Sequence, residues 1–108
     1  MRQIKREKTE EIIHRLAAQF IQEISGNTSL ITITRVELSE AGKNANIFFT
    51  TIPEKEENTA KKFLDRKIKE FKHHLRDNSK LGFIPHLDFQ IDYGERNRQR
   101  LDELSKES

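Results

Sequence analysis

Apolar residues recur at spacings of three and four within residues 8–24, and one face of this segment holds Ile13, Leu16, Ala17, Phe20 and Ile24. This periodicity predicts an amphipathic helix over residues 8–24, with polar side chains on its opposite face. Ile4 is out of phase with the stripe. We therefore expect residues 1–7 to form a flexible basic arm ahead of the helix.

The pattern then changes to that of short strands. Residues 30–38 are rich in β-branched side chains, which favours a strand. Residues 45–52 alternate, and Ala45, Ile47 and Phe49 point toward one side. A turn containing Gly42 separates the two segments, so an antiparallel hairpin is the simplest arrangement. Pro53 has no N–H to donate and marks the end of the second strand.

A second helical stripe occupies residues 59–77 and consists of Ala60, Phe63, Leu64, Ile68, Phe71 and Leu75. A third strand is predicted through the apolar positions Phe83, Leu87, Phe89, Ile91 and Tyr93. Pro85 near its start indicates an edge position or a bulge. The helical crossover between the second and third strands permits them to pair in parallel.

This order of elements, helix-strand-strand-helix-strand, predicts an α+β two-layer sandwich with two or three helices on one face of a three-stranded sheet. A chain of 108 residues is long enough for one small domain, which we assign to residues 1–94. Residues 95–108 are almost wholly polar and are expected to form a C-terminal tail or a short helix.

Composition narrows the possible functions. The chain has no cysteine, which excludes a disulfide scaffold, a thiol nucleophile and a cysteine-ligated metal site. No apolar run approaches the roughly 18 residues of a membrane span, so we expect no membrane partner and a cytoplasmic location. The formal net charge is only +2, yet 35% of the residues are charged. Residues 61–80 alone hold eight Lys or Arg against three Asp or Glu, a net +5.

The positive charge of this segment is organised on the predicted second helix. At 100° per residue, one arc opposite the apolar stripe contains Lys62, Arg66, Lys69, His73 and Arg76, which we call the basic ridge. The shoulders of the ridge hold Lys61, Lys67 and Lys72, and Lys80 follows the helix. Aligned cations of this kind contact phosphates and release counterions from a nucleic acid, although a solvated charged face is the plainer alternative. A second basic cluster in the N-terminal arm, Arg2, Lys5, Arg6 and Lys8, is expected to supplement it.

The sequence contains little that indicates a catalytic site or a metal site. The four histidines, at positions 14, 73, 74 and 86, do not have the spacing of metal ligands on one face. The chain contains no glycine-rich phosphate loop and no hydrolase motif. Asp88 and Asp92 are the one carboxylate pair considered for acid–base work, and we place both on the outer face of the third strand. We therefore expect no enzyme activity, no cofactor and no metal.

Three segments together carry a resemblance to a known family. They are residues 31–39 (ITITRVELS) with the following strand 46–49 (NIFF), residues 83–89 (FIPHLDF), and residues 100–104 (RLDEL). In this order and spacing, over about residues 5–104, the chain resembles the ribosome-binding factor A family. The resemblance implies a KH-like fold of the second topological type and a non-enzymatic factor. Such a factor binds ribosomal RNA and acts late in maturation of the small ribosomal subunit; we expect a monomer.

One segment departs from the family pattern. Where the family has an Ala-x-Gly kink in the second helix, this chain has Lys67-Ile68-Lys69. Because glycine is absent, we expect the helix to run straight or to kink less sharply. A rival function from a different class stays open. The same fold would serve as a protein–protein adaptor whose basic ridge meets an acidic partner.

Overall fold

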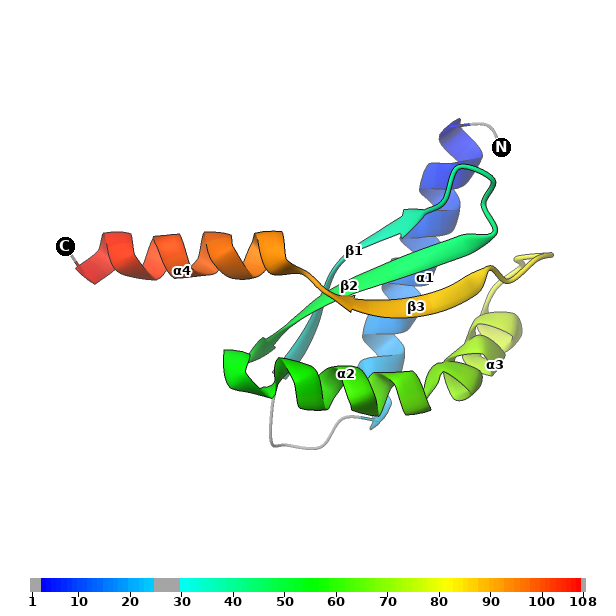
Figure 1. Ribbon diagram of the computed structural model, residues 1–108. Helices are drawn as coiled ribbons and strands as arrows, with labels where there is room; N and C mark the ends of the chain where they lie inside the picture. Colours follow the sequence, from blue (N-terminus) through cyan, green and yellow to red (C-terminus); the bar gives the residue numbers. More distant parts are fainter. Residues whose placement is uncertain (1–2, 25–29, 108) are drawn as a thin grey trace.

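The computed structural model of the chain describes residues 3–24 and 30–107. Figure 1 shows how the helices and strands of these ranges are arranged. The elements are α1 Gln3–Ile24, β1 Leu30–Leu38, β2 Asn44–Ile52, the 3-10 helix η1 Glu54–Glu56, α2 Glu57–Arg66, α3 Ile68–Asn78, β3 His86–Ile91 and α4 Tyr93–Glu107.

The three strands form one mixed sheet in the order β1-β2-β3. β1 and β2 pair antiparallel, which confirms the hairpin, and β3 joins the other side of β2 in parallel, with Ile47 opposite Phe89. β3 is therefore an edge strand, as Pro85 predicted. The register of β1 shifts between Ile33 and Arg35, which leaves an extra residue in the strand. Such a bulge re-aims the side chains that follow, so Ile33 and Val36 are both buried although three positions apart.

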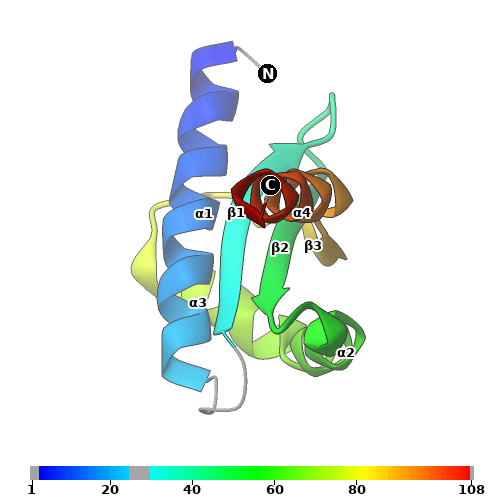
Figure 2. The same ribbon diagram turned by 90° about the vertical axis from the view of Figure 1, so that its left-hand side faces the viewer.

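One hydrophobic core joins the sheet to α1, α2 and α3. Phe49, Phe71 and Phe89 are fully buried, and the ring centroids of Phe71 and Phe89 lie 5.8 Å apart. Phe20 of α1 reaches the same cluster, with its centroid 5.3 Å from that of Phe71. α4 projects away from this body (Figures 1 and 2). The predicted α+β arrangement of helices layered on a three-stranded sheet is confirmed.

The expected single helix over residues 59–77 is wrong, because the chain forms two helices that meet at Lys67. Lys67 has φ −101° and ψ 1°, and its N–H donates to the carbonyl oxygen of Leu64 at 2.9 Å. This closes a tight turn of the 3-10 type and ends α2. The N–H of Phe71 then donates to the carbonyl oxygen of Lys67 at 2.9 Å, which starts α3.

Packing explains why the break occurs without glycine. α2 lies against β3 and buries Leu64, whereas α3 lies against α1 and buries Phe71 and Leu75. One straight helix has a single axis and cannot follow both neighbours. The turn needs only a negative φ, which lysine adopts as readily as other residues. The absence of glycine was therefore not a valid reason to expect a straight helix.

The chain ends also differ from expectation. α1 begins at Gln3, so residues 3–7 are helical rather than a flexible arm. β3 begins at His86 and ends at Ile91, which leaves Phe83 and Tyr93 outside the strand. Both rings are exposed, because Phe83 lies in the loop before β3 and Tyr93 opens α4. The polar C-terminal residues form a helix of 15 residues, which is the helical one of the two alternatives expected for this segment.

Candidate nucleic-acid interface

The cations of residues 62–80 occupy α2, α3 and the loop that follows α3. Lys67 is at intermediate exposure. The others are exposed, namely Lys62, Arg66, Lys69, Lys72, His73, Arg76 and Lys80. The break at Lys67 divides the basic ridge, so Lys62 and Arg66 belong to α2 and the other three members to α3. The ridge is therefore a surface of two consecutive helices rather than one arc of a single helix (Figure 1).

Two of the three carboxylates in residues 61–80 are engaged by lysines that do not belong to the basic ridge. Asp65 pairs with Lys61 at 3.2 Å, and Glu70 pairs with Lys67 at 3.6 Å. Lys61 also donates to the carbonyl oxygen of Phe89 at 2.9 Å and so covers part of the edge strand β3. Among the described residues, no ion pair within 4.0 Å involves the remaining Lys or Arg residues of 62–80. Their charge is thus directed to solvent.

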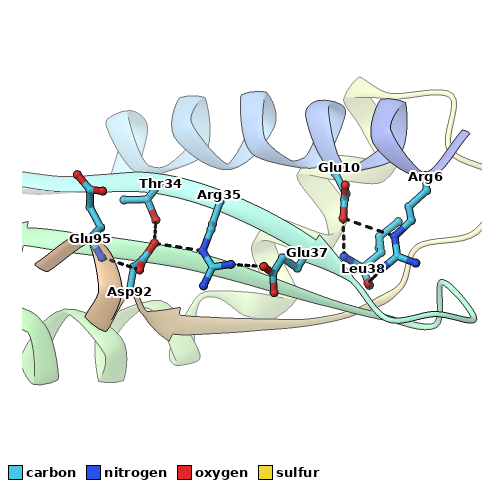
Figure 3. A network of polar contacts seen from close by, with 8 residues as sticks. All are labelled: Arg6, Glu10, Thr34, Arg35, Glu37, Leu38, Asp92 and Glu95. Atoms are coloured by element: carbon cyan, nitrogen blue, oxygen red, sulfur yellow. Dashed lines mark hydrogen bonds and ion pairs between the residues drawn. The ribbon is translucent and has the colours of Figure 1, made fainter. Parts of the chain in front are cut away.

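The N-terminal cluster behaves differently. Arg6 forms an ion pair with Glu10 and donates to the carbonyl oxygen of Leu38, while the N–H of Leu38 donates to Glu10 at 2.9 Å (Figure 3). Arg6 is therefore part of the contact between α1 and the end of β1. Lys5 and Lys8 are exposed on α1. Arg2 lies outside the described residues.

The prediction that Asp92 is an outward carboxylate of the third strand is wrong. Asp92 is a buried residue that follows β3. It accepts hydrogen bonds from the Thr34 hydroxyl at 2.6 Å, from the Glu95 N–H at 3.0 Å and from Arg35 Nε at 3.3 Å (Figure 3). Burial opposes its ionisation, but the hydrogen bonds and the Arg35 charge outweigh that effect and lower the pKa of Asp92. The bond from Glu95 makes Asp92 the N-cap of α4.

This network assigns Asp92 a structural role and separates it from Asp88. Asp88 instead accepts a hydrogen bond from Gln90 and lies 3.9 Å from Lys61. The carboxylate pair considered for acid–base chemistry is therefore not assembled. Among the residues that the structure describes, no three His, Asp or Glu side chains gather as a group that would hold a metal ion.

A shallow groove of about 400 Å³ lies between α1 and β1. Its lining residues are Glu10, Glu11, His14, Arg15, Thr34, Arg35 and Val36. Both signs of charge are present, so the groove does not select a phosphate-rich ligand by charge. Arg35 at its margin lies over the Phe48 ring at 4.0 Å, a cation–π contact that the sequence pattern did not reveal.

Phe83 is an exposed aromatic residue beside the basic segment, with 64% of its surface accessible. The alternating pattern had predicted it as part of the third strand. Pro85 was the available signal, because a residue without an N–H is poorly suited to the interior of a strand ladder. Lys43, in the turn between β1 and β2, joins the same end of the sheet: the His86 N–H donates to its carbonyl oxygen at 2.8 Å.

The fold and this surface define a class of protein, a small KH-like α+β domain with an unneutralised basic surface on consecutive helices. The sequence profile of ribosome-binding factor A matches residues 5–105, and the chain belongs to the ribosome-binding factor A family. None of the described helices has the length and apolar character needed to cross a bilayer.

Solved structures of other proteins resemble this one, including the two that follow. The crystal structure of ribosome-binding factor A from Thermus thermophilus has a TM-score of 0.71 and 23% identity, covering 80% of this chain and 93% of the other. A solution NMR structure of a Thermotoga maritima protein, described as a candidate ribosome-binding factor A, has a TM-score of 0.68 and 25% identity. It covers 83% of this chain and 89% of the other. No curated protein sequence matches the chain.

Proposed function

We propose that this protein is a non-enzymatic ribosome-binding factor that binds ribosomal RNA of the small subunit during late maturation. It would act in the cytoplasm as a monomer. Family membership supports the ribosome as the partner. The observation that favours RNA over an acidic protein surface is the run of cations along α2 and α3 without carboxylate partners among the described residues.

The mechanism follows from electrostatics. Lys62, Arg66 and Lys69 approach successive phosphates, and each contact releases condensed counterions into solution. Binding is therefore strong at low salt and reversible at higher salt, as a transient assembly factor requires. Arg76 and Lys80 extend the contact toward the loop before β3, and Lys5 and Lys8 add a weaker supplement from α1.

The test is co-sedimentation with free small subunits, large subunits and complete ribosomes across a salt series. The triple variant Lys62→Glu, Arg66→Glu, Lys69→Glu is expected to lose small-subunit binding while its circular dichroism stays native. A matched control reverses three cations elsewhere: Arg15→Glu, Lys55→Glu and Arg98→Glu. The control has the same net charge as the ridge variant and is expected to retain binding.

Three results would contradict the proposal. Undiminished binding of the ridge variant would remove the interface. Equal binding of the unmodified protein to all three particles would indicate a generic polycation. Complexes in lysate that survive nuclease treatment would favour the adaptor function, with an acidic protein as partner.

A further inference from the structure

The loop between α3 and β3 presents an aromatic ring beside the basic surface. Phe83 is one of the few large apolar residues that the described chain leaves exposed, with 64% of its surface accessible. Its neighbours in the loop turn the other way: Leu81 and Ile84 pack against the hydrophobic core, and Pro85 is buried. The loop is thus anchored on both sides of a ring that faces solvent.

The ends of this loop are also fixed by hydrogen bonds. Ser79 Oγ donates to the carbonyl oxygen of Leu75 at 2.6 Å, and Asn78 Nδ2 donates to that of His74 at 2.9 Å, which caps the end of α3. On the other side, the His86 N–H donates to the Lys43 carbonyl oxygen at 2.8 Å and ties the loop to the β1–β2 turn. Phe83 is therefore presented by a preorganised segment.

The charges around Phe83 favour a polyanion. Lys80 precedes it by three residues, Lys43 is exposed in the adjoining turn, and Arg76 lies on the last turn of α3. Carboxylates at this end are those of Glu40 and Asp77. The space at the preceding Gly82 is open, because a Cβ added there would meet no atom within 4 Å outside the adjoining residues.

An exposed aromatic ring flanked by cations is the arrangement with which proteins hold single-stranded nucleic acid. The ring stacks on a base, and the cations meet the flanking phosphates. We propose that Phe83 stacks on an unpaired RNA base next to the phosphate contacts of the basic ridge. The inference rests on the proposed RNA binding and adds to it a preference for single-stranded RNA at this end of the sheet.

Fluorescence gives a direct test, since the chain contains no tryptophan. Phe83→Trp places the single indole at the proposed stacking position. Leu101→Trp is the matched control, because Leu101 is equally exposed at 64% and lies on α4, which projects from the opposite end of the sheet. With a single-stranded oligoadenylate as probe, we expect the fluorescence of Phe83→Trp to be quenched and that of Leu101→Trp to stay unchanged.

Affinity measurements separate stacking from plain apolar contact. Phe83→Ala and Phe83→Leu are both expected to weaken binding of the single strand about 5- to 100-fold, the cost of losing one base–aromatic stack. Binding of an RNA duplex of equal length is expected to stay within about 2-fold. Leu101→Ala serves as the control for both probes.

The outcomes distinguish the two proposals. If the ridge variant loses RNA binding while Phe83→Ala binds normally and Phe83→Trp is not quenched, the stacking proposal is wrong and the RNA-binding proposal stands. If Phe83→Leu binds like the unmodified protein, the contact is apolar rather than stacking, which also overturns the inference. If the unmodified protein binds small subunits but neither probe at low salt, the stacking proposal is wrong; if it binds neither the probes nor small subunits, both proposals fail.

Discussion

The two basic regions of this protein have similar residue types but different surroundings. In α1, Arg6 is held by Glu10 and by the backbone of Leu38, so its charge stabilises the contact between helix and sheet. In the α2–α3 region, Lys61 and Lys67 form the ion pairs with Asp65 and Glu70. The cations of the basic ridge have no such pair among the described residues and face solvent. A count of charges cannot separate these roles, because the position of the partner decides whether a cation serves the fold or a ligand.

The largest expected difference between the regions is in salt dependence. Neutralising Lys62, Arg66 and Lys69 to Gln is expected to reduce the slope of log affinity for RNA against log salt by about 2 to 3. Neutralising Arg6, Lys61 and Lys67 to Gln should change it by less than about 1, because these cations already have partners in the protein. Filter binding across a salt series measures both slopes. Equal changes in the two variants would show that cations paired within the protein contribute to RNA binding as much as the unpaired cations of the ridge.

The second test concerns Asp92, which joins β1 to the start of α4 through its bonds to Thr34, Arg35 and the Glu95 N–H. Asp92→Ala removes the cap of α4, leaves the Thr34 hydroxyl and Arg35 Nε without this acceptor, and keeps the bond from Arg35 to Glu37. We expect a loss of about 3 kcal/mol in the free energy of unfolding, measured with urea. Asp92→Asn keeps the size and one acceptor, so a loss of about 1 kcal/mol is expected. A loss below about 0.5 kcal/mol for Asp92→Ala would mean that the network contributes little.

The same carboxylate predicts a pH dependence. The pKa of Asp92 is lowered below its ordinary value of 3.8, since the hydrogen bonds and Arg35 outweigh burial. The folded state therefore favours the ionised form, and its stabilisation is complete above that value and is lost as the pH falls through the lowered pKa. The stability difference between the unmodified protein and Asp92→Asn should be constant above about pH 5 and shrink on acidification below about pH 4. A difference that grows on acidification would have the wrong sign.

A smaller effect is expected at Arg6. Arg6→Gln removes the ion pair with Glu10 and the charged donor to Leu38, and it should cost about 1 kcal/mol of unfolding free energy. Lys8→Gln is the matched control on the same helix; it is exposed and should change stability by less than about 0.5 kcal/mol. If the two variants are equally stable, Arg6 is no more engaged than Lys8.

The smallest effect is expected where α2 meets α3. Lys67→Gly restores a glycine near the place of the family's kink, and Lys67→Ala removes the same side chain without adding backbone freedom. Because Lys67 already has a negative φ, glycine gains nothing in the folded state and enlarges the unfolded ensemble. Lys67→Gly should therefore be less stable than Lys67→Ala by about 0.5–1 kcal/mol in urea unfolding. The opposite order would show that a non-glycine residue is disfavoured at this turn.

Local pattern predicted most of the elements of this fold. The stripe from Ile13 to Ile24 indicated the first helix, and the alternation through Ala45, Ile47 and Phe49 indicated the central strand. These predictions held because periodicity records which face of each element meets the core, and that depends on neighbours in the chain. The concentration of cations in residues 61–80 was visible for the same reason.

Only the tertiary structure decided the features that depend on distant residues. α2 and α3 separate at Lys67 because one packs on β3 and the other on α1. Asp92 is buried because Thr34 and Arg35, nearly sixty residues away in sequence, supply its donors. Phe83 is exposed because Leu81 and Ile84 take the inward positions of its loop. A sequence determines what each residue is able to contact, whereas packing determines which of those contacts are formed.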